Sequence, residues 1–160
     1  MGFDDASLGT VVKFVFALHL LFAIFAIGPL VHAATTAGRG VRTGDGTATA
    51  SSARMLKIYS YASVLVVLAG GALMSMNDPD EKGQKLGEFS QTWIWLSVLL
   101  WLVAVAIVLA VIVPTLNTAT ALIQQQSSVV TLTGRVAAAG GVVGVIFAGI
   151  VFLMVYQPGH

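Results

Sequence analysis

Four apolar stretches dominate this sequence and constrain its fold more than any other feature. They cover residues 14–31, 58–76, 93–113 and 136–156, and they contain no Asp, Glu, Lys or Arg and a single histidine, His19. A helix needs roughly 20 apolar residues to cross the hydrocarbon core of a bilayer, so each stretch is long enough to span it. Charged residues make up 9% of the chain, well below the roughly 25% of an average soluble domain. The sequence therefore predicts an integral membrane protein.

The segments between the apolar stretches are too short to form a second domain. We expect an all-α fold, in which residues 1–160 form one integral membrane domain, a bundle of four transmembrane helices. The expected helices cover residues 10–34, 57–77, 91–114 and 135–157, and apolar residues at helical spacing extend the third to residue 126. The first stretch is longer than the roughly 7–15 apolar residues of a signal peptide, so we expect it to remain as a spanning helix.

Basic residues are distributed unevenly between the two sides of this predicted bundle. The connections after the first and third stretches hold Arg39, Arg42, Arg54, Lys57 and Arg135. The connection after the second stretch holds only Lys82 and Lys85, together with four acidic residues. Because Lys and Arg are enriched in cytoplasmic loops, we expect loops 35–56 and 115–134 in the cytoplasm and both termini outside. The expected location is the cytoplasmic membrane of a bacterium or archaeon.

The first and third stretches end in similar segments, AIGPLVHAATTA and VIVPTLNTATAL. Both contain a proline, Pro29 or Pro114, a polar residue three places later, and then an Ala-Thr pair. Two copies of a helical hairpin in the same orientation would produce this pattern. The alternative is that prolines and small polar residues simply close a spanning helix. In either case we expect Pro29 and Pro114 to kink their helices, because proline lacks the amide donor of a helical residue.

His19 and His32 are the candidate cofactor-binding residues. An imidazole about halfway along a spanning helix is costly, so His19 should face protein or a water-filled cavity. It could be a ligand of haem b or copper. Alternatively, it could be a neutral side chain that is hydrogen-bonded to Ser63, Ser97 or a backbone group of another helix. His32 is rotated away on a straight helix. A haem site would thus need a methionine, or His19 of a second copy, as its other ligand.

The sequence contains no recognisable catalytic constellation or metal-binding motif. Acidic residues are confined to the connections, and the absence of cysteine excludes disulfides and thiolate metal sites. The scattered arginines are too sparse to indicate nucleic-acid binding. We therefore expect no catalytic residues, no metal site built from a ligand motif, and no enzymatic activity.

Small residues recur at helical spacing in two of the apolar stretches. Stripes of this kind let helices in a bilayer approach each other closely. They can be used inside the bundle, which we favour, or against a partner subunit. The residues concerned are Gly140, Gly144 and Ala148 in the fourth stretch, and Ala62, Ala69 and Gly70 in the second.

The segment VKFVFALHLLFAIFAIGPLV, with Lys13, His19 and Gly28, resembles the first helix of the DUF2269 family of bacterial membrane proteins. It is more distantly similar to CopD-like copper-resistance proteins. Tyr59 and Trp93 fit the same layout, as does Pro114. The resemblance implies a four-helix membrane protein without an assigned activity. The additional intramembrane histidines that a haem- or copper-handling relative would have are missing from this sequence.

Taken together, these features predict a small non-enzymatic membrane protein. We expect it to contact the lipid bilayer and other membrane protein subunits, as an accessory or assembly subunit of a larger complex, with respiratory or other electron transfer as the setting. Assembly into a homo-oligomer is also compatible with the sequence. The alternative is a haem-b or copper protein that uses His19, across a homodimer.

Overall fold

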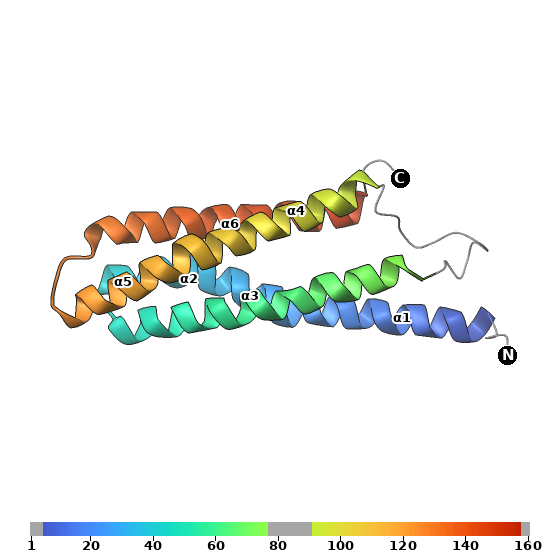
Figure 1. Cartoon of the computed structure of the whole chain (residues 1–160), viewed down its shortest axis with the longest axis horizontal. Helices are drawn as coiled ribbons and strands as arrows, with labels where there is room; N and C mark the ends of the chain where they lie inside the picture. The colour runs from blue at the N-terminus through green and yellow to red at the C-terminus, as the bar shows by residue number, and fades with distance from the viewer. Residues whose placement is uncertain (1–4, 77–90, 158–160) are drawn as a thin grey trace.

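The computed structural model describes residues 5–76 and 91–157, with side chains from residue 9 onward. All regular structure in these residues is helical, and four continuous helical runs are long and apolar enough to cross a membrane. The predicted all-α bundle of four spanning helices is therefore confirmed (Figure 1). In chain order the elements are α1 (Asp5–Phe22), the π-helical segment η1 (Ala23–Ile27), α2 (Gly28–Thr43), α3 (Gly46–Met74), α4 (Thr92–Ile107), the π-helical segment η2 (Val108–Ile112), α5 (Val113–Gln124) and α6 (Val130–Tyr156).

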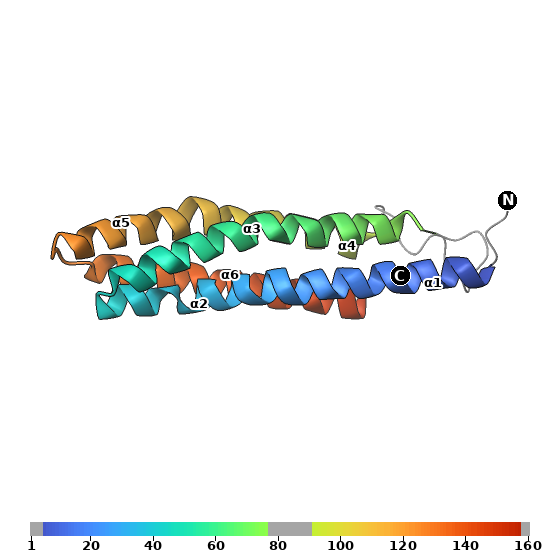
Figure 2. The same ribbon diagram turned by 90° about the horizontal axis from the view of Figure 1, so that it is seen from below.

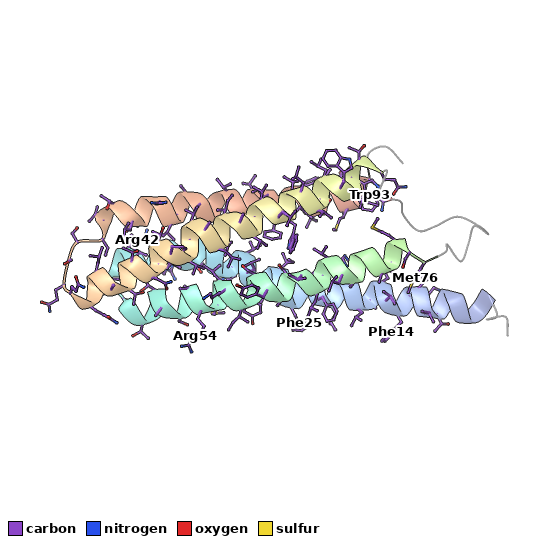
Figure 3. All side chains as sticks on the ribbon, viewed as in Figure 1. Phe14, Phe25, Arg42, Arg54, Met76 and Trp93 are labelled. Carbon is purple, nitrogen blue, oxygen red and sulfur yellow. The ribbon has the colours of Figure 1, made fainter. Side chains whose placement is uncertain are left out.

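The same order of elements occurs twice in the described chain. In each half, a helical run interrupted by a π-helical segment is followed by an uninterrupted helix that returns antiparallel to it. The first hairpin is α1–η1–α2 with α3, and the second is α4–η2–α5 with α6. Both hairpins turn at the same end, called the basic end because Arg42 and Arg54 lie toward it, whereas Met76 and Trp93 lie at the far end (Figure 3). The two hairpins thus have the same orientation.

The helices change their packing partners at the π-helical segments. Toward the far end, α1 packs on α3 and α4 packs on α6, each within its own hairpin. Toward the basic end, α2 packs mainly on α6 and α5 packs mainly on α3, so that each interrupted run crosses to the other hairpin. Figures 1 and 2 show the elements converging toward the basic end. Most of the large buried side chains also lie there, among them Leu30, Leu56, Ile112 and Leu116.

A π-helical segment lies directly before each of the two prolines that the sequence analysis singled out. Pro29 and Pro114 occupy the first turns of α2 and α5. A proline inside a helix lacks an amide hydrogen, and its ring clashes with the carbonyl four residues earlier. Those carbonyls belong to Phe25 and Ala110, the central residues of η1 and η2. The wider π-helical turn moves these carbonyls away from the rings, so the runs continue past the prolines.

The predicted loop at residues 35–56 is wrong, because nearly all of it is helical. The helix α2 continues to Thr43 and α3 begins at Gly46. The many Gly, Thr, Ser and Ala residues of this segment have small side chains, which make the two helices narrow. A Cβ atom on Gly40 would lie 3.2 Å from the Ala48 Cβ and 3.3 Å from the Thr49 amide nitrogen. Small side chains therefore allow α2 and α3 to pack closely right up to the turn.

The turn between α2 and α3 consists of Gly44 and Asp45. Gly44 has a φ of 65°, a left-handed conformation that glycine adopts without steric cost. The Gly44 and Asp45 amides donate to the carbonyls of Val41 and Gly40, which is the Schellman pattern that ends a helix. The Asp45 carboxylate accepts a hydrogen bond from the Ala48 amide at 2.9 Å and caps the start of α3.

The second predicted loop, residues 115–134, is also largely helical. The helix α5 ends at Gln124, close to the predicted extension to residue 126, and α6 begins at Val130. Only residues 125–129 connect the two helices. Threonines at 115, 118 and 120 donate their hydroxyl protons to carbonyls one turn earlier in the chain. Such bonds satisfy the hydroxyl within the helix, which explains why this polar segment does not form a loop.

The helices α2 and α6 approach each other closely at Gly140. A Cβ atom on Gly140 would overlap the Ala34 carbonyl oxygen and lie 2.9 Å from its carbon. A Cβ on Gly144 would lie 3.3 Å from the Thr35 methyl carbon, Cγ2. Ala148, the third member of the predicted stripe, is exposed instead. A spacing of four residues advances the stripe by about 40° at each step, so Ala148 has rotated away from α2.

The small residues of α3 have three different environments. Ala69 is buried, Ala62 is half-buried, and Gly70 lies against α1. Gly71, next to Gly70, would meet no atom within 4 Å if it carried a Cβ. The glycine pair of α3 is thus asymmetric, with one residue in a contact and the other facing open space.

Substitution of Gly140 by alanine should separate α2 from α6. Because the added methyl group meets backbone and not a flexible side chain, we expect Gly140→Ala to lower the free energy of unfolding by about 1–3 kcal/mol. Gly141→Ala is the matched control, because a Cβ there meets nothing within 4 Å. It should be neutral, or stabilising by up to about 1 kcal/mol through helix propensity. Unfolding by SDS titration in mild detergent, followed by circular dichroism, measures both, and equal shifts would contradict the packing described here.

Candidate functional site

His19 forms a hydrogen bond that joins α1 to α3 within the membrane span. Its Nδ1 atom lies 3.0 Å from the Val66 carbonyl oxygen. Because a carbonyl oxygen can only accept, Nδ1 must carry the proton and donate it. The bond thereby fixes the orientation of the ring and leaves Nε2 as the other polar atom. Of the predicted environments for His19, the structure gives a backbone group of another helix.

Gly70 makes room for this imidazole. A Cβ atom at position 70 would lie 3.2 Å from Cε1 and 3.5 Å from Nδ1 of His19. The Val66 carbonyl stands one helical turn before Gly70, so the missing side chain leaves that carbonyl open to a group from α1. Sequence reasoning identified His19 and Gly70 separately but did not pair them. A glycine one turn after a membrane-embedded carbonyl, facing a helix with a single histidine, is the signal that could have linked them.

Ser63 and Ser97, the predicted side-chain partners of His19, make other bonds. The Ser97 hydroxyl donates to the Trp93 carbonyl in its own helix at 2.7 Å. Ser63 accepts a hydrogen bond from Trp101 Nε1 at 3.0 Å and donates to the Ser60 carbonyl at 2.7 Å. The bond from Trp101 joins α4 of the second hairpin to α3 of the first. Sequence reasoning missed Trp101, which lies deeper in its span than the tryptophans at positions 93 and 95.

In its half toward the far end, α3 therefore accepts two hydrogen bonds on one face. One comes from α1 of the first hairpin and the other from α4 of the second hairpin. Val66 and Ser63 are three residues apart, so His19 of α1 and Trp101 of α4 approach neighbouring turns of the same helix. Ser60, one turn further toward the basic end, is 1% exposed, and its hydroxyl has no hydrogen-bond partner among the described residues. A third polar bond within the bundle, between the Thr49 and Thr120 hydroxyls at 2.7 Å, joins α3 to α5. Helix α3 thus takes part in each of these three interhelical hydrogen bonds within residues 9–76 and 91–157.

The two histidines predicted as cofactor ligands are not brought together. His32 lies in α2, beyond the π-helical segment, and its side chain is exposed. Its carbonyl accepts hydrogen bonds from the hydroxyls of Thr35 and Thr36. Across the described part of the chain, no three His, Cys, Asp or Glu residues are grouped so that they could hold a metal ion. His19 therefore offers one nitrogen ligand, and His32, in α2, does not join it.

The basic end carries two grooves where the hairpins cross. One, of about 330 Å³, lies between α2 and α6 and is lined by Arg39, Arg42 and small residues. The other, of about 480 Å³, lies between α3 and α5 and is lined by Arg54 and Lys57, together with polar residues of α5. Asp45 is the one acidic residue whose side chain is described, and it is occupied as a helix cap. Both grooves therefore carry positive charge without a neighbouring carboxylate in the described chain.

Comparisons with known proteins identify the family of this chain and nothing finer. A family model described as a predicted integral membrane protein, DUF2269, matches residues 10–158. Neither the curated proteins nor the solved structures yield a match. The resemblance seen in the first apolar stretch is therefore confirmed, and it extends over nearly the whole chain.

Substitution of Gly70 by leucine should displace His19 from the Val66 carbonyl. In the unmodified protein we expect ¹⁵N NMR of the imidazole to show a proton on Nδ1, because that nitrogen donates to a backbone oxygen. Gly70→Leu should abolish this signature and cost about 0.6 kcal/mol, the average for an interhelical hydrogen bond in a bilayer. Gly71→Leu, at the open neighbouring position, should preserve it. An unprotonated Nδ1 in the unmodified protein would contradict the hydrogen bond.

Proposed function

The chain belongs to the DUF2269 family of predicted integral membrane proteins, and from this membership we propose that it acts inside the bilayer as a non-enzymatic accessory or assembly subunit. Its proposed partners are other subunits of a larger membrane complex, with respiratory or other electron transfer as the setting. The observation that carries this proposal is a stripe of small residues on the outer face of α6.

This outer stripe of α6 consists of Gly134, Gly141 and Ala148. All three residues are exposed, and a Cβ on either glycine would meet no atom within 4 Å. They recur every seven residues, so they lie along one face of the helix. Val145 and Phe152, both exposed, flank the stripe. This face of α6 therefore carries exposed small residues together with large exposed apolar side chains.

A second helix fits such a face better than lipid does. Inside a bilayer, apolar burial does not drive helices together, and close backbone approach with good packing takes its place. The bundle itself uses this mode, because Gly140 and Gly144 of the same helix pack on α2. Gly134, Gly141 and Ala148 form a second stripe of small residues, turned about 80° around α6 from Gly140 and Gly144. No helix of the described chain covers it. These features support an interaction with a transmembrane helix of another subunit.

The proposed orientation places the basic end in the cytoplasm. Five basic residues lie toward that end, in α2, α3 and α6, and they favour this arrangement by the positive-inside rule. In the naturally cysteine-free chain, Tyr156→Cys should react with a membrane-impermeant maleimide in intact cells, whereas Ser127→Cys should react only after lysis. The reverse pattern would contradict this orientation.

A haem-b or copper protein is the competing proposal, and one observation favours it. Ligand histidines commonly donate their other ring nitrogen to a carbonyl, as His19 does to Val66. A second ligand would have to be a methionine or His19 of a second copy. An absorption spectrum of the purified protein separates the two proposals, because a Soret band that is lost in His19→Ala would contradict the accessory role.

Substitution of Gly141 by leucine should release the partner subunit while leaving the bundle folded. Tagged protein isolated from its native membranes in mild detergent should carry the partner, and Gly141→Leu should lower the partner yield about tenfold, equivalent to about 1.4 kcal/mol. Quantitative mass spectrometry of the eluate measures this yield. Gly71→Leu, at an open position of α3, is the matched control and should retain the partner.

Two outcomes would contradict the accessory role. One is isolation of the protein as a free monomer under every mild condition. The other is an equal partner yield from Gly141→Leu and the unmodified chain.

A further inference from the structure

We propose that the groove between α3 and α5 at the basic end binds the head group of an anionic phospholipid. Arg54 and Lys57 of α3 supply the positive charge, and Asn117 and Gln124 of α5 supply side-chain amide donors. This inference does not depend on the accessory role, because it concerns a different surface of the molecule.

The four polar side chains of this groove are available for a ligand. All of them are exposed, and none hydrogen-bonds or ion-pairs with another described residue. An arginine and a lysine one turn apart on a helix lie on the same face, so both cations can reach one phosphate. The amide groups stand across the groove and can donate to the ester oxygens or to a hydroxylated head group.

The part of the groove at Lys57 and Asn117 also lies at the depth of lipid head groups. Lys57 immediately precedes the apolar stretch that begins at Ile58, and Asn117 lies four residues beyond Val113, where another apolar stretch ends. At about 1.5 Å per residue, both positions fall within about 6 Å of the hydrocarbon boundary. Basic pockets between spanning helices at this depth are suited to anionic lipid head groups. The space of about 480 Å³ lies within the range of roughly 300–1,000 Å³ that small-molecule sites occupy.

The groove between α2 and α6 offers charge without these free donors. Arg39 and Arg42 line it, but the hydroxyls of Thr35, Thr36 and Thr133 already donate to carbonyls of their own helices. Its arginines also stand further along the chain from the apolar stretch that ends at Val31. The two grooves therefore form a natural pair of test and control sites with equal formal charge.

Native mass spectrometry of the full chain in mild detergent, titrated with phosphatidylglycerol, tests this site. Each cation near a membrane surface contributes about fivefold in affinity, so Arg54→Gln with Lys57→Gln should weaken binding about thirtyfold. Arg39→Gln with Arg42→Gln removes the same charge and should weaken binding less than about fivefold. Phosphatidylcholine, whose phosphate is offset by its own cation, should bind the unmodified chain at least about tenfold more weakly.

Three results would overturn the proposal. Equal losses from the two double variants would indicate general attraction to the basic end and no built site. Equal affinity for phosphatidylglycerol and phosphatidylcholine would exclude charge recognition. Competition by glycerol phosphate at the same concentration as the lipid would assign the groove to a free phosphate compound, because the acyl chains would then contribute nothing.

Discussion

The contact between Gly140 and the Ala34 carbonyl is the constraint on which the rest of the bundle depends. It brings the backbones of α2 and α6 together and so joins two hairpins that otherwise pack mainly within themselves at the far end. Apolar surface alone could not do this in a bilayer, because lipid tails cover it equally well. Exposed phenylalanines such as Phe14 and Phe25 illustrate the point, since they face outward along the first run (Figure 3).

The partner exchange at the prolines follows from the same need for close packing. A straight α1–α2 run would stay against α3, whereas the π-helical turn before Pro29 allows α2 to reach α6. Pro114 and η2 give α5 the corresponding access to α3. The crossings bury the large side chains at the basic end and also create the two charged grooves there. The π-helical segments before the two prolines thus determine where the bundle is tightly packed and where the two grooves form.

The sequence was sufficient for the membrane class and the four spans, because these depend on long apolar stretches. It predicted kinks at Pro29 and Pro114 but not the π-helical segments that precede these prolines. It was misleading at residues 35–56, where we expected a loop but small residues form a narrow helical hairpin closed by Gly44 and Asp45. The partner of His19 was missed, because it is a backbone carbonyl, and the only residue type that points to it is the glycine at position 70. The stripe at Gly140 was visible, but only the packing of α6 on α2 shows that Ala148 lies outside the contact.

Cysteine cross-linking between α2 and α6 tests the exchange of helix partners most directly. Because the sequence contains no cysteine, no other thiol competes with the introduced pair. A Cβ on residue 38 would lie 3.4 Å from the Ala137 Cβ, close to the separation of about 3.5–4.5 Å found in disulfides. Gly38→Cys with Ala137→Cys should therefore cross-link nearly completely in native membranes under mild oxidation, as identified by mass spectrometry of the joined peptides. If this pair stays reduced while Gly40→Cys and Ala48→Cys within the first hairpin cross-link readily, the two hairpins do not cross as described.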